Sequence, residues 1–514
     1  MVKNIAKNTV KDFRILLVYA NTSMEPLMSL GIASIATALQ MAGFNVKLFD
    51  TTFYKDEQND SQMAREDSLQ IKSVDYSQVG VRSINGDPVE DFKNAVRNFK
   101  PHLIGLSCVE LTWPQGLKLL ESVKKYKIPN VVGGCFATFS PEEVVSNDTV
   151  NMVCIGEGER AIVELARKMS LNEQIVDIPN LWIKKGDTII RSKMGDLIEL
   201  ESLPISQFGI FAPERIYRAM AGKIYRMLPI EFSRGCPYKC TYCSAPSYAK
   251  KFSHVGRWLR FKSVGHIMDE IDFYIKEYNV EYFYFVSESF LAMPAEYKKE
   301  FYSSYKKYRI PFWFNTRPET INYNDIRCLE DVGCHRISIG IESGNEEFRR
   351  MVLKRNYSNE NILKAVNIVL KSKIQLSVNN MIGFPDETRE MVFDTIKLNR
   401  EFKADNHSIS IFQPFRGTEL YDYCMSKGYW NPAKLCTESF ATPALEMPTL
   451  TKDEIRGLYR TFNLYINAEM IFWNDIKKAE KFDEEGNRAF FELTQRFHSQ
   501  SDIPAKDYTR KLHG

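Results

Sequence analysis

Short apolar runs and helix-like patterns alternate along the first part of the chain. The run FRILLVYA at residues 13–20 is typical of a buried strand, and apolar positions recur at helical spacing over residues 30–41, before Gly43 can end the helix. Further strand-like runs are NVKLFD, HLIGLSCVE, NVVGG and MVCIGEGE. Strands separated by helices predict a parallel sheet with crossover helices, and therefore a doubly wound, Rossmann-like domain over residues 1–171.

Two stretches interrupt this alternation. Residues 55–91 are polar and show little periodicity. Residues 172–225 are rich in isoleucine, proline and charge, and they contain no long periodic helix. We interpret the second stretch as a linker between two domains.

From residue 226 onward, strand and helix patterns alternate again, about six times. The strand-like runs are LPIEFS, EYFYFV, PFWFNT, HRISIGI, IQLSVNNMI and HSISIFQ. In the helix that Ser263 can cap, apolar positions recur every three or four residues, as on a helix that packs against a barrel. The chain is therefore predicted to be an α/β protein with a partial (β/α)6 barrel over residues 226–429 and a helical region over residues 430–514.

Composition limits the classes of partner. Of 514 residues, 44% are hydrophobic and 12% aromatic, which is enough to bury sizeable cores. The 68 basic and 65 acidic residues nearly balance, so the chain has no electrostatic footprint for nucleic acid. No apolar run approaches the roughly 20 residues that a membrane span needs, and the first residues lack the apolar stretch of a signal peptide. We therefore expect a cytoplasmic protein with neither a membrane span nor a nucleic-acid partner.

The cysteines are unevenly distributed. Seven of the ten are scattered, whereas Cys236, Cys240 and Cys243 lie together directly after the first barrel strand. Three thiolates at this spacing can hold a 4Fe–4S cluster and leave one iron without a protein ligand. The alternatives are a zinc site or three unrelated cysteines. Zinc normally takes four ligands, and the nearest histidine, His254, has no partner at the usual spacing.

Polar residues follow the apolar strands of the predicted barrel. Catalytic groups of such barrels gather at the carboxyl ends of the strands, so these residues are expected to lie beside the cysteines. The strand ends carry Ser287-Glu288-Ser289, Asn315-Thr316-Arg317, Glu342-Ser343, Asn379-Asn380 and Gln413. Each alone is more often a loop residue than a ligand, but five in register with a cysteine loop favour a site.

The pattern C-x3-C-x-aromatic-C after the first strand of a βα repeat resembles the radical S-adenosylmethionine (SAM) superfamily, over about residues 228–428. The resemblance implies that Cys236, Cys240 and Cys243 bind a 4Fe–4S cluster and that SAM chelates its fourth iron. It also implies SAM contacts from Tyr242, Glu288, Arg317, Glu342 and Ser343. Of these, Glu288 stands in VSESF, where the family often carries two aspartates. No catalytic residue is assigned from the sequence.

A doubly wound domain before such a barrel resembles the cobalamin-binding branch of the superfamily. The resemblance implies cobalamin contacts from Ser107, Thr112, Gly133, Gly134, Gly156 and Glu157, although the glycines could equally be ordinary turn residues. Where some cobalamin domains carry Asp-x-His-x-x-Gly, this chain has DTTFYK from Asp50 to Lys55. Cobalamin would therefore bind without histidine, its lower face meeting the loop of residues 110–113.

The resemblance implies an enzyme that reductively cleaves SAM to a 5′-deoxyadenosyl radical. The expected reaction is cobalamin-dependent methylation of an unactivated carbon or phosphorus centre in a small-molecule or lipid-like substrate, with flavodoxin or ferredoxin as electron donor. The alternatives are radical ring formation, carbon–carbon bond formation or rearrangement without methyl transfer. A cobalamin or iron–sulfur sensor module is the non-enzymatic alternative.

Overall fold

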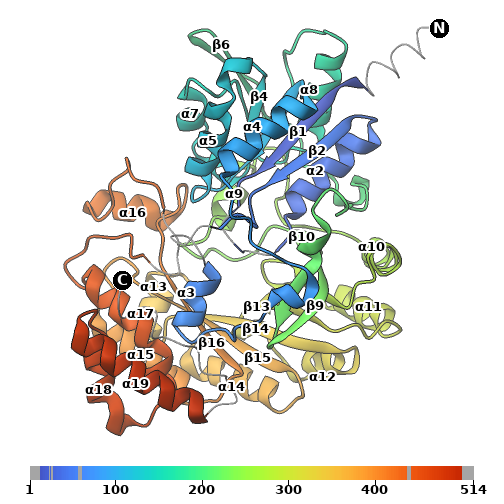
Figure 1. Ribbon diagram of the computed structural model, residues 1–514. Helices are drawn as coiled ribbons and strands as arrows, with labels where there is room; N and C mark the ends of the chain where they lie inside the picture. Colours follow the sequence, from blue (N-terminus) through green and yellow to red (C-terminus); the bar gives the residue numbers. More distant parts are fainter. Residues whose placement is uncertain (1–11, 22–23, 25–26, 56–60, 437–441, 501–514) are drawn as a thin grey trace.

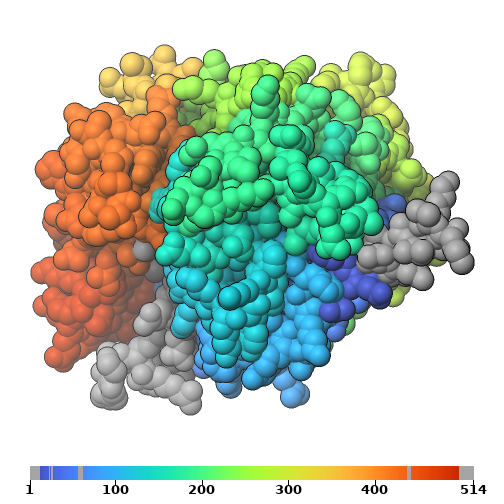
Figure 2. Space-filling model, turned by 90° about the horizontal axis from the view of Figure 1, so that it is seen from above, coloured from blue at the N-terminus to red at the C-terminus, as the bar shows by residue number. Residues whose placement is uncertain are grey.

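A computed structural model describes residues 12–21, 24, 27–55, 61–436 and 442–500. Over these residues the chain forms two seven-stranded sheets, each covered by helices, and a helical C-terminal region. In Figure 1 the N-terminal domain lies above the second sheet, and the red C-terminal helices pack beside that sheet. Viewed from above, the N-terminal domain occupies the middle of the molecule and covers the second sheet (Figure 2).

The N-terminal sheet has the strand order β2-β1-β3-β4-β5-β6-β7. Its strands are β1 (Arg14–Tyr19), β2 (Asn45–Asp50), β3 (Leu103–Ser107), β4 (Asn130–Gly133), β5 (Met152–Cys154), β6 (Leu181–Lys185) and β7 (Thr188–Arg191). The first five are parallel. The helices around them are α2 (Leu30–Met41), α4 (Pro88–Phe99), α5 (Trp113–Ser122), α6 (Cys135–Phe139), α7 (Pro141–Ser146) and α8 (Glu159–Ser170). Separate apolar clusters on the two faces of the sheet confirm the doubly wound prediction.

The order of the parallel strands fixes where a ligand can bind. In an open sheet of order 2-1-3-4-5 the connections leave in opposite directions on either side of the point between β1 and β3. Ligands of such sheets bind in the crevice outside the carboxyl ends of the strands at this point. In Figure 1 the carboxyl ends of the parallel strands point toward the second domain.

Residues 172–225 are more than a linker. The hairpin β6–β7 extends the N-terminal sheet with two antiparallel strands, and β8 (Tyr217–Met220) pairs with the second sheet. The hairpin turns at Gly186, which has a φ of +58°. Its strands have five and four residues and each ends in basic side chains, Lys184 and Lys185 in β6 and Arg191 in β7, so no long apolar run marks them in the sequence.

The second sheet is the predicted partial barrel. Its order is β16-β15-β14-β13-β12-β9-β8, and all neighbours except β8 and β9 are parallel. The parallel strands are β9 (Lys223–Glu231), β12 (Tyr282–Val286), β13 (Phe312–Thr316), β14 (Cys334–Glu342), β15 (Gln375–Ile382) and β16 (Asn406–Ile411). The connecting helices include α10 (Val264–Tyr278), α11 (Ala295–Tyr305), α12 (Tyr323–Asp331), α13 (Glu346–Met351), α14 (Asn359–Leu370), α15 (Arg389–Arg400) and α16 (Glu419–Lys427). Ser263 caps α10 as predicted, because its hydroxyl accepts a hydrogen bond from the His266 amide.

The C-terminal region is helical, as predicted. It comprises α17 (Lys452–Asn467), α18 (Trp473–Ala479) and α19 (Glu484–Gln500). Buried side chains of α17 pack against α15 and β16 in one apolar cluster. Residues 437–441 and 501–514 of the predicted helical region lie outside the described residues. None of the helices among the described residues is long and apolar enough to cross a lipid bilayer.

The polar stretch after β2 closes the open side of the barrel. It contains α3 (Ser61–Asp67), and we call residues 61–79 the closing segment. The side-chain Oε1 of Gln70 accepts hydrogen bonds from the Ser408 hydroxyl and the Ile409 amide of β16, each at 2.9 Å. At its other end the Tyr76 hydroxyl accepts from the Ala219 amide of β8 at 2.9 Å. Figure 1 shows α3 in blue against the yellow and orange barrel strands. The segment therefore bridges the two edge strands of the barrel.

Candidate active site

The cysteine loop begins at a short two-stranded ladder. β10 (Ser233–Arg234) pairs with β11 (Arg260–Phe261), and Gly235 follows directly. Gly235 has a φ of +103°, and a Cβ there would lie 2.8 Å from the Trp258 carbonyl oxygen. Only glycine fits this turn without displacing backbone. The turn therefore fixes the direction in which the three cysteines leave the sheet.

The three cysteine side chains fit the ligands of an iron–sulfur cluster. All ten cysteines are free thiols, and Cys240 is buried. Burial, together with the charges of Glu288, Cys243 and Cys240, raises the pKa of Cys236 to about 12, so the three thiols lie within electrostatic range of one another. Among the described residues no three His, Cys, Asp or Glu side chains converge as the ligands of a single metal ion do. Thiolates around a cluster differ in this respect, because each binds its own iron.

Arg317 contacts the cysteine loop directly. Its Nη1 lies 3.0 Å from the Cys240 sulfur, and its guanidinium carbon lies 3.8 Å from the ring centroid of Tyr238. Its Nε donates to Glu319 at 2.6 Å. The sequence suggested a SAM contact for Arg317. In the structure the guanidinium of Arg317 contacts the cysteine loop, where its positive charge can neutralise the negative charge of the thiolates.

Arg355 joins the cysteine loop to the predicted SAM residues. The side chain is buried, and its Nη1 lies 2.8 Å from the Tyr242 hydroxyl and 3.4 Å from the Glu342 carboxylate. The same nitrogen lies 3.8 Å from the Cys240 sulfur. Sequence reasoning missed this residue, because Lys354-Arg355 resembles a solvated basic pair and only the fold separates the exposed lysine from the buried arginine.

The resemblance predicts SAM contacts from Tyr242, Glu342 and Ser343, and the structure places Tyr242 and Glu342 beside one cavity. Tyr242 packs against Phe384, with ring centroids 5.7 Å apart, and lines a cavity of about 680 Å³ together with Glu342. Glu342 ends β14 with a φ of +67°, an uncommon conformation for a residue with a side chain. Strain of this kind often accompanies ligand sites. The Ser343 hydroxyl is buried and has no hydrogen-bond partner among the described residues, so a bound ligand could satisfy it.

Of the other polar residues at the strand ends, some lie beside the cysteine loop or line the cavity, and others bind neighbouring strands and helices. Glu288 is exposed, and its carboxylate accepts a hydrogen bond from the Gly235 amide at 3.1 Å, directly before the first cysteine. Asn379 and Asn380 both line the cavity, and the Asn380 amide also donates to Asn399 and to the carbonyl of Ser408. The prediction that strand ends meet at one edge therefore holds, although not every polar residue there faces the cavity.

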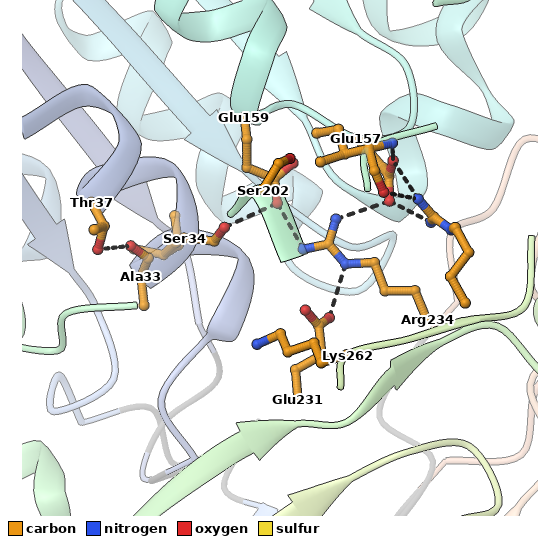
Figure 3. Close-up of polar contacts among 12 residues, drawn as sticks. Ala33, Ser34, Thr37, Glu157, Glu159, Ser202, Glu231, Arg234 and Lys262 are labelled. Carbon is orange, nitrogen blue, oxygen red and sulfur yellow. Dashed lines mark hydrogen bonds and ion pairs between the residues drawn. The ribbon is translucent and has the colours of Figure 1, made fainter. Parts of the chain in front are cut away.

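Buried ion pairs connect the N-terminal domain to the start of the cysteine loop (Figure 3). Arg234 donates to Glu231 at 3.0 Å within the barrel domain, and to Glu157 at 2.9 Å and Glu159 at 2.8 Å in the N-terminal domain. Arg260 also binds Glu157, at 2.6 Å. We call these five residues the charge network. It holds the carboxyl end of β5 against Arg234, two residues before Cys236.

The carboxylate of Glu157, a predicted cobalamin contact, is bound by protein groups. Both of its carboxylate oxygens are engaged, by Arg234 and Arg260 on one side and by the Ile198 amide on the other. Although burial opposes it, these guanidiniums hold the pKa of Glu157 below its usual range. We therefore propose Glu157 as an interdomain ion-pair residue rather than a cobalamin contact.

A second ion pair connects the loop after β3 to the barrel. Glu110 is buried and pairs with Arg416, which lies shortly after β16, and it also accepts a hydrogen bond from the Cys436 amide at 3.1 Å. Arg416 further contacts Glu143 at 3.2 Å. The sequence placed Glu110 in a loop below the corrin. In the structure the Glu110 carboxylate connects that loop to the barrel domain through Arg416 and the Cys436 amide.

Two of the predicted cobalamin glycines are required by protein packing. A Cβ on Gly134 would lie 2.3 Å from the Cys108 carbonyl oxygen, and a Cβ on Gly156 would lie 2.4 Å from the Phe252 ring. Close packing against Cys108 and Phe252 therefore requires glycine at both positions. Gly133 is less crowded, with its nearest contact at 3.8 Å.

The crevice after β3 presents other features to a ligand. Ser107 is half-buried at the end of the strand, and Val109 is 45% exposed although it is apolar. Thr112 is buried, and its hydroxyl accepts from the Val109 amide at 3.2 Å, which closes the loop. An exposed apolar side chain at the switch point of a doubly wound sheet fits a large ligand with an apolar face, as a corrin has.

Two family models match the chain. The model of the radical SAM superfamily matches residues 230–398, and that of the B12 binding domain matches residues 16–166. An uncharacterized methyltransferase of Pyrococcus horikoshii is 24% identical over 72% of this chain and 79% of its own length. Cytidylyl-2-hydroxyethylphosphonate methyltransferase of Streptomyces wedmorensis is 20% identical over 85% of this chain and 86% of its own length. The anaerobic magnesium-protoporphyrin IX monomethyl ester cyclase of Rubrivivax gelatinosus is 21% identical over 80% of this chain and 74% of its own length.

Solved structures share the complete fold. The radical SAM methyltransferase TsrM from Kitasatospora setae, with cobalamin and a 4Fe–4S cluster bound, superposes with a TM-score of 0.63 at 14% identity, over 95% of this chain and 99% of that chain. The cobalamin-dependent radical SAM enzyme OxsB, with aqua-cobalamin and SAM bound, gives 0.64 at 15% identity, over 95% and 71%. The radical SAM match implies a 4Fe–4S cluster and SAM, and the B12 match implies cobalamin. The chain therefore carries a radical SAM domain preceded by a B12-binding domain.

Proposed function

We propose that the protein methylates an unactivated carbon or phosphorus centre of a small molecule in a cobalamin-dependent reaction. The charge network is the observation that carries this proposal. It fixes the carboxyl edge of the N-terminal sheet against Arg234, which directly precedes the cysteine loop. A ligand at that edge and a ligand at the cysteines would therefore face the same space, as direct methyl transfer between them requires.

In this proposal three groups of residues bind the iron–sulfur cluster, cobalamin and SAM. We propose that Cys236, Cys240 and Cys243 hold the cluster, and that the crevice between β1 and β3, with Ser107 and Val109, holds cobalamin. Tyr242, Glu342, Ser343 and Arg355 would hold SAM, with Glu288 beside the cysteine loop. When bound, the cluster supplies the electron that cleaves SAM, and cobalamin supplies the methyl group that is transferred.

The rest of the chain orients these groups and excludes water. Arg317 and Arg355 place two guanidiniums beside Cys240, where positive charge favours both thiolate ligands and the carboxylate of SAM. The closing segment seals the side of the barrel below them. A reactive radical needs such an enclosure, because side reactions are suppressed when the site is shielded from solvent.

The identities of the substrate and the electron donor remain proposals. A phosphonate methyltransferase among the relatives supports a small polar substrate, and we propose flavodoxin or ferredoxin as the source of the electron. A second candidate is radical ring formation without methyl transfer, which the similarity to the protoporphyrin ester cyclase favours. The two candidates share SAM cleavage and differ in whether the methyl group of SAM is used.

We expect the full chain, reconstituted anaerobically with iron, sulfide and hydroxocobalamin and then desalted, to retain corrin absorption bands beside the broad iron–sulfur absorption. On reduction with SAM that carries a trideuterated methyl group, the label should appear on cobalamin extracted from the protein, as detected by mass spectrometry. A protein that retains the corrin and cleaves SAM without labelling cobalamin would support ring formation. A protein that retains no corrin would refute cobalamin-dependent methylation.

A further inference from the structure

The lumen of the barrel is polar rather than packed with apolar side chains. Barrels of this type normally fill their interior with layers of branched residues such as valine, isoleucine and leucine. In this chain Asn315, Ser338, Ser377 and Ser408, from four successive strands, line the cavity of about 680 Å³. Serine and asparagine are too small to fill the space and too polar to leave dry. The lumen is therefore built to hold a polar molecule.

Two arginines, Arg218 and Arg336, line the end of this cavity that lies near the amino ends of the barrel strands. Arg218 of β8 reaches across to β12 and β13, where its guanidinium carbon lies 5.6 Å from the Trp313 ring centroid and 5.9 Å from that of Tyr284. Trp313 is the register partner of Arg336 on β14. We call Arg218, Trp313 and Arg336 the floor of the cavity. It lies near the amino ends of the strands, opposite to Tyr242 and Glu342.

The two floor arginines differ from three other arginines near the domain interface in having no ion-pair partner within the part of the chain that the structure describes. Arg234, Arg260 and Arg416 each pair with a glutamate. Among the described residues neither Arg218 nor Arg336 forms an ion pair, although Arg336 donates to the Gln375 side chain at 2.6 Å.

Polar hydrogens of the floor also lack acceptors. The Arg218 Nη1 and the Trp313 Nε1 are buried and have no hydrogen-bond partner among the described residues. A buried donor without an acceptor costs about 1–3 kcal/mol, so an oxyanion between these groups would relieve the cost. Of the two acidic residues that line the same cavity, Glu342 lies beside Arg355. Asp405 acts on Arg336 by its charge, but it forms no ion pair with Arg336 and accepts a hydrogen bond from the Leu376 amide.

We propose that the floor binds the anionic group of the substrate, a carboxylate, sulfonate or phosphonate. The rest of the substrate extends along the serines and asparagine toward Tyr242 and Glu342, where the proposed function places SAM. The inference rests on that proposed function for the identity of the upper end, but not for the binding of the anion. An anion site at the floor of a polar cavity narrows the expected substrate class to small polar anions. The lipid-like substrates that the sequence left open are then excluded.

The test measures binding of benzenesulfonate to the full, cluster-reconstituted chain by isothermal titration calorimetry, without SAM or reductant. Benzenesulfonamide, which is nearly the same size but uncharged, is the reference ligand. We expect Arg218→Gln and Arg336→Gln each to weaken benzenesulfonate binding about tenfold or more, since a charge-assisted hydrogen bond contributes about 1.5–3 kcal/mol. Arg336→Lys, which keeps the charge, should retain most of the affinity.

The matched control is Arg327→Gln. Arg327 is exposed on α12, outside the barrel, and its loss should leave binding unchanged. The proposal is overturned if the natural chain binds benzenesulfonate no better than benzenesulfonamide, or if Arg327→Gln weakens binding as much as the floor variants do. Circular dichroism of each variant confirms that it is folded. Failure of the proposed function would appear separately, as a chain that binds the sulfonate through the floor but does not cleave SAM.

Discussion

Replacement of Cys240 by alanine is expected to reduce SAM cleavage to background while cobalamin stays bound. Cys240 is the buried member of the cysteine loop, and both Arg317 and Arg355 contact its sulfur. Two cysteines cannot hold a cluster that normally needs at least three protein thiolates in this family of sites, so iron content should fall with activity. The corrin should remain, because the proposed crevice lies in the other domain. The measurements are iron per chain, 5′-deoxyadenosine after reduction, and the corrin absorption bands.

Cys328 provides the matched control for this variant. It is a free, half-buried thiol on α12, away from the cysteine loop, so Cys328→Ala should keep both the iron and the activity. Full SAM cleavage by Cys240→Ala would mean that the cluster is held elsewhere.

Replacement of Arg234 by methionine is expected to destabilise the protein strongly. The change removes the cation from a cluster in which Glu157, Glu159 and Glu231 all bind it, and all four side chains are largely buried. Breaking a buried ion pair by removing one partner costs about 3–5 kcal/mol, because the other charges are left uncompensated. In calorimetry this should lower the unfolding midpoint by on the order of 10 °C and separate the transition of the N-terminal domain from that of the barrel.

Arg234→Lys, which keeps the charge but not the geometry, should recover part of the loss. The exposed Arg327 again supplies the control, as Arg327→Met. A midpoint unchanged in Arg234→Met would show that the charge network does not hold the domains together.

The same network predicts a dependence of stability on pH. The folded-state pKa of Glu157 lies below its ordinary value of 4.5, so its contribution is fully present above about pH 4.5 and is lost as the pH falls through the folded-state pKa. In Arg234→Met the folded-state pKa should rise, because one guanidinium is gone while burial remains. The variant should therefore lose less stability on acidification than the natural chain, because the folded-state and unfolded-state pKa values of Glu157 lie closer together, as followed by unfolding midpoints across an acid series.

Regular patterns in the sequence predicted the scaffold and the cysteine loop. The helix expected over residues 30–41 and the strand NVKLFD at residues 45–50 occur with those bounds, because apolar spacing and end residues agree there. The cysteine loop was identifiable because its spacing is a chemical requirement of the cluster.

Features that depend on contacts between distant segments were not predictable. The closing segment looks like a polar loop in sequence, because its anchors are Gln70 and Tyr76, which bond to barrel strands instead of forming an apolar face. Glu157 lies next to glycines that suggested a ligand loop, and only the structure shows that its partners are Arg234 and Arg260. Arg355 and its neighbour Lys354 are both basic in sequence, and only the fold shows that Arg355 is buried while Lys354 is exposed.

The most direct test of the whole account is the formation of 5′-deoxyadenosine and methionine from SAM by the reconstituted, cobalamin-loaded chain under a strong reductant. The account predicts that both products form in equal amounts, that the Cys240→Ala variant forms neither, and that Cys328→Ala matches the natural chain. A chain with a full complement of iron that produces no 5′-deoxyadenosine would contradict the assignment as a radical SAM enzyme and would favour a sensor module.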